Sequence, residues 1–164
     1  YCWRCSPITL PSGSSALFWK SQRGDVKNET AFNAWLKSEF GKYPSLVTLK
    51  AVDKVHEGIP DFLMWHLGKS RSLEVKLLRE APKRPATLIL KHAFTGGQLK
   101  FLRDLSRAGS AGYGLVGYKT DMFLFPSETL AALGGNFVLG AMLEQERFDM
   151  DPKGVANLLS RVFT

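Results

Sequence analysis

Residues 58–76 read GIPDFLMWHLGKSRSLEVK, and this stretch decides the fold. Two apolar runs, 62–67 and 73–78, lie on either side of a short polar segment that begins at Gly68. Two β-prone runs separated by a few residues that include a glycine are typical of a β-hairpin. We therefore predict a hairpin whose turn is formed by Gly68 and Lys69.

This hairpin would bring three charged side chains to one point. Side chains alternate in direction along a strand, so Glu74 and Lys76 share one face. With the predicted turn, Asp61 lies opposite Lys76 and Leu63 lies opposite Glu74. An acid and a lysine inside an otherwise apolar strand are costly unless they are paired or used. Two carboxylates and a lysine that converge at strand ends suit a divalent metal ion and a phosphate.

The same residues carry a family resemblance. Pro60-Asp61 followed by Glu74-Val75-Lys76 resembles the PD-(D/E)xK nuclease superfamily. With the preceding Gly58-Ile59, the later Thr95-Gly96-Gly97-Gln98-Leu99 and Gly109, the chain looks most like the VRR-NUC branch. The likeness covers about residues 29–118. The ordered set is more specific than the bare D…ExK pattern, because short motifs recur by chance.

The resemblance implies an α/β fold with a restriction-endonuclease-like αβββαβ core, in which helices flank a mixed central sheet. The hydrophobic pattern of the chain agrees with that order. The expected elements are a helix at 29–40, strands at 46–52, 59–67, 71–78 and 112–118, and a helix at 95–108 packed across the sheet.

These residue types suit phosphodiester hydrolysis, in which metal ions neutralise the phosphate and activate water. Mg²⁺ takes hard oxygen ligands and keeps several waters, so Asp61, Glu74 and the backbone carbonyl of Val75 are its expected ligands, with Mn²⁺ as a substitute. Lys76 would hold the water or hydroxide and offset charge on the phosphate. The resemblance implies the same roles.

The helix expected at 29–40 carries a further candidate acid. Asn28 can cap this helix, and a carboxylate at Glu29 in its first turn would also complement the helix dipole. That structural role explains Glu29 without any catalytic function. Similar nucleases place an acid on this helix near the metal, however, so the resemblance gives Glu29 a place in the site, with Glu39 as a competitor.

Gln98 also has two interpretations. Thr95 and Gln98 form a capping-box pattern, in which the Gln98 side chain returns to the Thr95 N–H. The resemblance instead places a glutamine here beside the lysine, near the attacking water or the scissile phosphate. The expected helix ends at Gly109, and Leu99, Leu102 and Leu105 (with Phe101) would form its buried side.

Positive charge is clustered in this chain, whose net charge is +7. Residues 69–100 contain eight Lys or Arg residues and two acids. A basic loop at 79–94 departs from the usual VRR-NUC spacing and is either a DNA-gripping flap or a solvated loop. Its candidate DNA-binding residues are Arg79, Lys83, Arg84, Lys91 and His92. The charge favours a polyanionic partner, and nucleic acid before a membrane.

Residues 1–28 show little periodicity and are interpreted as an irregular arm, a possible fragment of an upstream element, ahead of a nuclease domain at 29–164. Cys2 and Cys5 form a lone C-x-x-C pair, and a structural zinc needs four ligands, so zinc is not expected. Two cysteines make no disulfide framework, which favours the cytoplasm. No apolar run reaches the roughly 18 residues of a membrane span.

The C-terminal part is expected to contain strands at 112–118 and 122–125, a short helix from residue 127 to about 133 and a last helix at 151–163. The last helix has an apolar stripe that is either core or a dimer face. The stripe consists of Val155, Leu158, Leu159 and Val162. The aromatic run 123–125 is open to the same two interpretations.

The residues and the resemblance together predict an Mg²⁺-dependent DNA endonuclease. Stand-alone relatives of this size are similar to Holliday-junction resolvases that act as homodimers, so the resemblance implies branched, Holliday-junction-like DNA as the leading substrate. Resolving a junction takes paired nicks, and one site per chain then implies a two-fold homodimer. One alternative is a nuclease on duplex or single-stranded DNA in repair, restriction or phage replication. The other is a non-catalytic DNA-binding module, for which Asp61, Glu74 and Lys76 would not all be needed.

Overall fold

The computed structural model describes residues 28–50, 58–80, 94–134 and 137–164. The helices of this part are α2 (Glu29–Phe40), α3 (Gly96–Arg107), α4 (Ser127–Ala132), α5 (Leu139–Leu143) and α6 (Pro152–Val162). The strands are β1 (Leu46–Lys50), β2 (Phe62–His66), β3 (Lys69–Leu78), β4 (Ala111–Tyr118), β5 (Asp121–Pro126) and β6 (Glu146–Asp149). None of the helices described here has the length and apolar character needed to cross a membrane.

The strands form one mixed sheet in the order β1-β2-β3-β4-β5-β6. β3 and β4 are parallel, because the chain crosses over through α3 between them, and every other neighbouring pair is antiparallel. The element order α2-β1-β2-β3-α3-β4 is the predicted αβββαβ core, so the predicted fold class is confirmed. Two elements, α5 and β6, were absent from the prediction.

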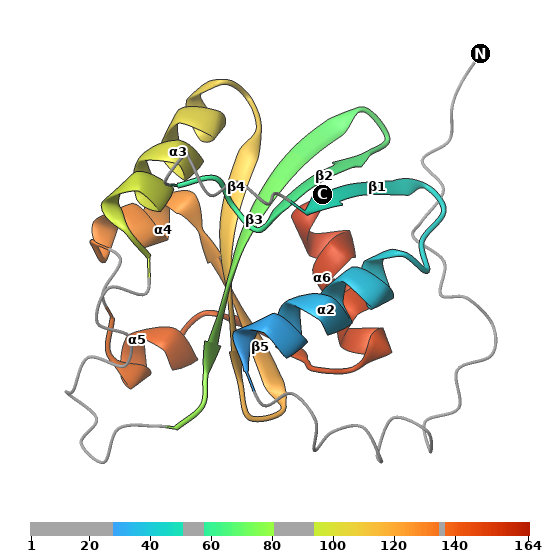
Figure 1. Ribbon diagram of the computed structural model, residues 1–164. Helices are drawn as coiled ribbons and strands as arrows, with labels where there is room; N and C mark the ends of the chain where they lie inside the picture. Colours follow the sequence, from blue (N-terminus) through green and yellow to red (C-terminus); the bar gives the residue numbers. More distant parts are fainter. Residues whose placement is uncertain (1–27, 51–57, 81–93, 135–136) are drawn as a thin grey trace.

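Helices cover both faces of the sheet (Figure 1). α2 and α6 pack on one face, around a core that includes Phe32, Phe62 and Val75. α3, α4 and α5 pack on the other, around a second core that includes Leu102 and Phe125. The predicted apolar stripe of the last helix lies entirely in the first core. Neither the stripe nor the aromatic run 123–125 is therefore exposed for a dimer contact.

The hairpin between β2 and β3 exists, but the predicted turn was wrong by one residue. His66 pairs with Lys69, so the turn consists of Leu67 and Gly68, both with positive φ. Two positive φ values define a type I′ turn, whose twist suits a two-residue hairpin. The strand register moves by two residues, and Leu63 lies opposite Ser72 rather than Glu74. A shift of two preserves the face of every side chain, so the predicted convergence survives.

Close approach at Gly114 lets the α3–α4 layer lie near the sheet. A Cβ atom at Gly114 would stand 2.7 Å from the Phe94 ring and 2.8 Å from Leu130. Real Cβ atoms do not come so near to packed neighbours, so a side chain here would push Phe94 and α4 away from β4. The bare backbone of β4 at Gly114 thus lets Phe94 and α4 pack directly on the sheet.

Leu67→Asn should stabilise the protein by about 1 kcal/mol, because a left-handed conformation strains leucine and suits asparagine. Leu67 has φ 48° and is 59% exposed, so the change removes no buried contact. Urea unfolding measures the effect. Leu67→Val is the matched control and should destabilise the protein, since a β-branched side chain tolerates this conformation least. A Leu67→Asn protein no more stable than the wild type would contradict the turn assignment.

Candidate active site

The site begins where β2 ends its pairing with β3. The last matched pair is Phe62 with Leu73, so the edge of β3 beyond Leu73 faces no β2 residue. The Asp61 side chain takes the place of a strand here, since its Oδ2 accepts a hydrogen bond from the Val75 N–H at 3.0 Å. The N–H and C=O of one strand residue leave on the same side. The Val75 carbonyl therefore lies on the same open edge as Asp61.

Asn33 holds the other oxygen of Asp61 and was missed in the sequence. Its Nδ2 donates to Asp61 Oδ1 at 3.3 Å, and the side chain is buried. One signal was available in the sequence. Asn33 lies one helical turn after Glu29 on α2, on the side of the helix that also buries Phe32 and Leu36. An unpaired polar group on that buried side would be costly, so its amide could be expected to have a partner.

Glu74 is the centre of the site and is only 2% exposed. Its Oε1 accepts hydrogen bonds from Lys76 Nζ at 2.6 Å and from Gln98 Nε2. Its Oε2 is buried and has no hydrogen-bond partner among the described residues. Burial raises the pKa of Glu74 to about 7, and the negative charge of Asp61 adds to the rise, while the Lys76 ammonium opposes it.

Lys76 is held between two acids. Its Nζ lies 2.6 Å from Glu74 Oε1 and 3.8 Å from Glu29 Oε1. Burial alone would lower the pKa of Lys76, but attraction and hydrogen bonding to Glu74 outweigh it, so the pKa lies above its ordinary value. Lys76 is therefore a cation at neutral pH. A protonated lysine can neutralise charge and donate a proton, but it cannot act as a general base.

Gln98 completes the predicted capping box, and its amide also reaches the site, while a role at the attacking water or the phosphate stays a prediction. Thr95 N donates to Gln98 Oε1 at 2.9 Å, and Gln98 N donates to Thr95 Oγ1 at 3.3 Å, which completes the capping box. The opposite end of the same amide, Nε2, reaches Glu74. Gly58 brings this helix start close, because a Cβ there would lie 2.6 Å from the Gly97 backbone. The cap thus fixes which amide atom faces the carboxylate.

The structure separates Glu29 from its competitor Glu39. Glu39 is buried at the other end of α2 and pairs with Lys42 at 2.6 Å, away from the site residues. Arg79 follows β3 and is exposed. The remaining predicted DNA-binding residues of the basic loop, Lys83, Arg84, Lys91 and His92, lie outside the described residues, as do Cys2 and Cys5.

Comparison with known proteins gives a likeness of fold. No protein-family model and no curated protein matches the chain. A solved structure of Archaeoglobus fulgidus Hjc, a Holliday junction resolvase from an archaeal hyperthermophile, is similar with a TM-score of 0.50 and 16% sequence identity. The match covers 70% of this chain and 90% of that chain. The chain has a resolvase-like fold. This likeness does not single out the VRR-NUC branch.

The site offers a donor set that fits a hard divalent cation. Among the described residues, no group of three or more His, Cys, Asp and Glu side chains comes together to hold a metal. The available donors are instead the Asp61 and Glu74 carboxylates and the Val75 carbonyl. The buried Glu74 Oε2 without a partner is what a cation ligand would look like before the ion binds. Few protein oxygens and several waters is the coordination that Mg²⁺ prefers.

The raised pKa of Glu74 predicts a pH-dependent stability in metal-free buffer. The folded protein holds a proton on Glu74 up to about pH 7, whereas the unfolded chain loses it near its ordinary value of 4.5. Across that window the folded state binds more protons, so the Glu74 contribution to stability falls as the pH rises. We expect this loss to reach up to about 3 kcal/mol by pH 8.

Urea unfolding of wild type and Glu74→Gln at pH 5, 6, 7 and 8, with chelator present, isolates this contribution. The variant should show a flatter dependence of its unfolding free energy on pH, because a glutamine does not titrate. Parallel pH profiles for the two proteins would show that Glu74 is already ionised at pH 5.

Proposed function

We propose that this protein is a metal-dependent endonuclease that hydrolyses phosphodiester bonds in DNA. The observation that carries the proposal is the buried Glu74 carboxylate, with one oxygen bound to Lys76 and the other without a partner. A purely structural ion pair has no need of an unpartnered buried oxygen, which is costly. The same carboxylate lies at an open strand edge beside Asp61, in a resolvase-like fold.

The proposed metal ligands are Asp61, Glu74 and the Val75 carbonyl, with Mg²⁺ as the ion and Mn²⁺ as its substitute. Bound there, the ion would neutralise the scissile phosphate and lower the pKa of a coordinated water. The chain supplies the rest of the chemistry. Asn33 and the Val75 N–H fix the Asp61 carboxylate in one orientation. Gln98 does the same for Glu74.

Lys76 is proposed to act as a fixed cation. Because its ammonium is already charged, it can hold a water or hydroxide by hydrogen bonding and offset the charge that develops on the phosphate. Glu29 keeps a second carboxylate 3.8 Å from the ammonium. We propose that Glu29 positions Lys76 and orders water at the rim of the site, since its side chain is 46% exposed.

Branched, Holliday-junction-like DNA is the proposed substrate, and the VRR-NUC branch is the proposed family. The fold likeness to Hjc supports the first proposal, and the ordered residues from Gly58 to Gly109 support the second. The runner-up is a nuclease on duplex or single-stranded intracellular DNA. Incubation of the protein with four-way junction, duplex and single-stranded DNA, each with Mg²⁺ or with chelator, separates these substrates.

Lys76→Ala and Asp61→Asn should each abolish DNA cleavage while DNA binding and the fold persist. Gel assays of cleavage in Mg²⁺ and binding measurements in chelator give the two readouts. Lys42→Ala is the matched control, because Lys42 forms a 2.6 Å ion pair with a buried glutamate at the far end of α2. The control should cut at the wild-type rate. Wild-type cleavage by Lys76→Ala or Asp61→Asn would refute the site assignment.

We also propose that the protein acts as a homodimer, since paired nicks need two sites related by a two-fold axis. With the last helix buried, the best remaining apolar surface is on β1 and β2. Val47 and Trp65 are direct cross-strand neighbours, 62% and 42% exposed, and Leu49 is 55% exposed. β1 is an edge strand of the described sheet. A second copy of the chain would cover this apolar surface and the unpaired edge of β1 together.

Leu49→Ser combined with Trp65→Ser should convert the dimer into a monomer, as measured by light scattering. Paired nicks across a junction should then become single nicks. Leu143→Ser is the control, because Leu143 on α5 is equally exposed, at 55%, but lies far along the sheet from β1. A wild-type protein that is monomeric and cuts linear DNA as readily as junctions would remove both the dimer and the resolvase proposal.

A further inference from the structure

The Lys76 ammonium lies between two carboxylates that come from different elements, Glu74 on β3 and Glu29 on α2. Its Nζ stands 2.6 Å from Glu74 Oε1 and 3.8 Å from Glu29 Oε1. A charge-assisted hydrogen bond between nitrogen and oxygen is about 2.8 Å long, so the Glu29 contact is about 1 Å too long for one. Glu29 is therefore a second acceptor within reach of an ammonium that is bound to Glu74.

The two acids differ in how firmly they are held. Glu74 is 2% exposed, and its Oε1 accepts a second hydrogen bond from Gln98 Nε2. The Glu29 side chain is 46% exposed, and among the described residues Lys76 is the only side chain with which it forms an ion pair. Small rotations of the Glu29 and Lys76 side chains would therefore close the remaining gap, while Glu74 stays where it is.

The Glu74 carboxylate does not depend on Lys76 for its orientation. The capping box fixes the Gln98 amide, whose Nε2 donates to the same oxygen as the ammonium does. The other oxygen, Oε2, is buried and has no hydrogen-bond partner among the described residues. A cation that binds this oxygen would meet an acid already held in place by Gln98.

We propose that the Lys76 ammonium passes from Glu74 to Glu29 when a divalent cation binds Glu74. This inference rests on the proposed function, and it makes Glu29 a positioning residue that acts through the lysine. An ammonium and a divalent cation on one buried carboxylate repel each other strongly, because the effective dielectric constant there is low. Transfer to Glu29 relieves this repulsion. It also keeps the ammonium at the site, held by one acid, so Lys76 still serves as the fixed cation of the reaction.

The transfer couples Glu29 to the affinity of the site for the cation. With Glu29 present, the ammonium has a second partner and the cation binds Glu74 with less repulsion. Without Glu29, the cation binds against the full repulsion of the ammonium. This coupling requires Lys76, which separates the transfer from a simpler role. A Glu29 that bound the cation itself, or attracted it through its own charge, would strengthen binding with or without the lysine.

A double-mutant cycle on metal affinity tests the coupling without relying on cleavage. Mn²⁺ is titrated by calorimetry into the wild type, Glu29→Gln, Lys76→Met and the double variant. Glu29→Gln should weaken Mn²⁺ binding by about tenfold when Lys76 is present, a size usual for coupled sites. In the Lys76→Met protein the same change should alter the affinity by less than about twofold. An equal loss in both backgrounds would overturn the proposal.

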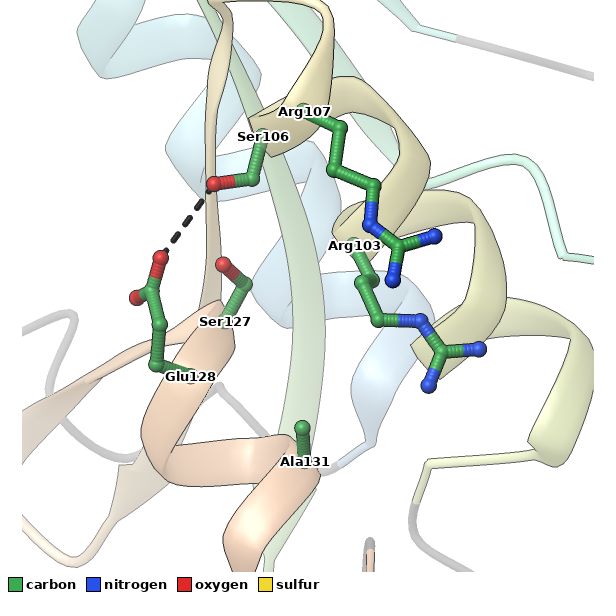
Figure 2. A pocket seen from close by; sticks show the side chains of 6 residues that line it. All are labelled: Arg103, Ser106, Arg107, Ser127, Glu128 and Ala131. Carbon is green, nitrogen blue, oxygen red and sulfur yellow. Dashed lines mark hydrogen bonds between the residues drawn. The ribbon is translucent and has the colours of Figure 1, made fainter.

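Glu128 provides the matched control, because it is a solvent-accessible carboxylate in the first turn of α4, as Glu29 is in the first turn of α2. Figure 2 shows it in a hollow of about 380 Å³ between α3 and α4, where its Oε1 accepts a hydrogen bond from Ser106 Oγ at 3.2 Å. The residues that line this hollow include none of the proposed site residues. Glu128→Gln should therefore leave the Mn²⁺ affinity unchanged. A loss equal to that of Glu29→Gln would mean that net charge alone is responsible, and would overturn the proposal.

Crystal structures of the wild type with and without Mn²⁺ would show the position of the ammonium directly, and they need no variant to fold. With Mn²⁺ bound, Lys76 Nζ should lie within about 3 Å of the Glu29 carboxylate and outside hydrogen-bond distance of Glu74. An ammonium still on Glu74 beside the ion, or an ion bound by Glu29 itself, would overturn this inference and leave the nuclease proposal standing. A wild type that binds no Mn²⁺ would overturn the proposed metal site and this inference together.

Discussion

The structure depends on one constraint, which is the burial of a carboxylate at Glu74. A buried charge is tolerated only with a partner and hydrogen bonds, and the neighbouring elements supply them. β3 provides Lys76 two residues away on the same face, and α3 provides the Gln98 amide. One oxygen nevertheless stays without a partner among the described residues. Without the opposing Lys76 ammonium, Glu74 would keep its proton to a higher pH, so the ion pair sets the protonation state of the site.

The pairing of β2 with β3 stops short of Val75, and this leaves room for a second carboxylate beside Glu74. A sheet normally satisfies both edges of an inner strand with backbone hydrogen bonds. Here β2 begins too late to pair with Val75, and a side chain, Asp61, accepts that N–H instead. The substitution brings a second carboxylate against β3 without breaking the β3–β4 ladder, which continues to Leu78. Asp61 is thus both a candidate metal ligand and the acceptor that satisfies the Val75 N–H at the edge of β3.

The sequence was sufficient for the elements with strong local signals. α2 begins after Asn28 and α3 after Thr95, because both caps are encoded within four residues. The faces of Glu74 and Lys76 were right although the turn was wrong, since an error of two in register preserves alternation. Asn33 was missed because its role depends on a partner 28 residues away. The short α5 and β6 were missed because packing rather than periodicity defines them.

The two helical layers differ in how much of their surface is buried. The α2–α6 layer buries most of its apolar side, including the whole stripe of the last helix, and presents Glu29 and Asn33 at one end. α3 buries little beyond Leu102, and Leu99, Phe101 and Leu105 are only partly buried, so most of its surface remains for polar contacts. Its first turn is fixed by the capping box and by Gln98 bound to Glu74. Under the proposed function, α3 therefore holds the Gln98 amide against the carboxylate that is proposed to bind the metal.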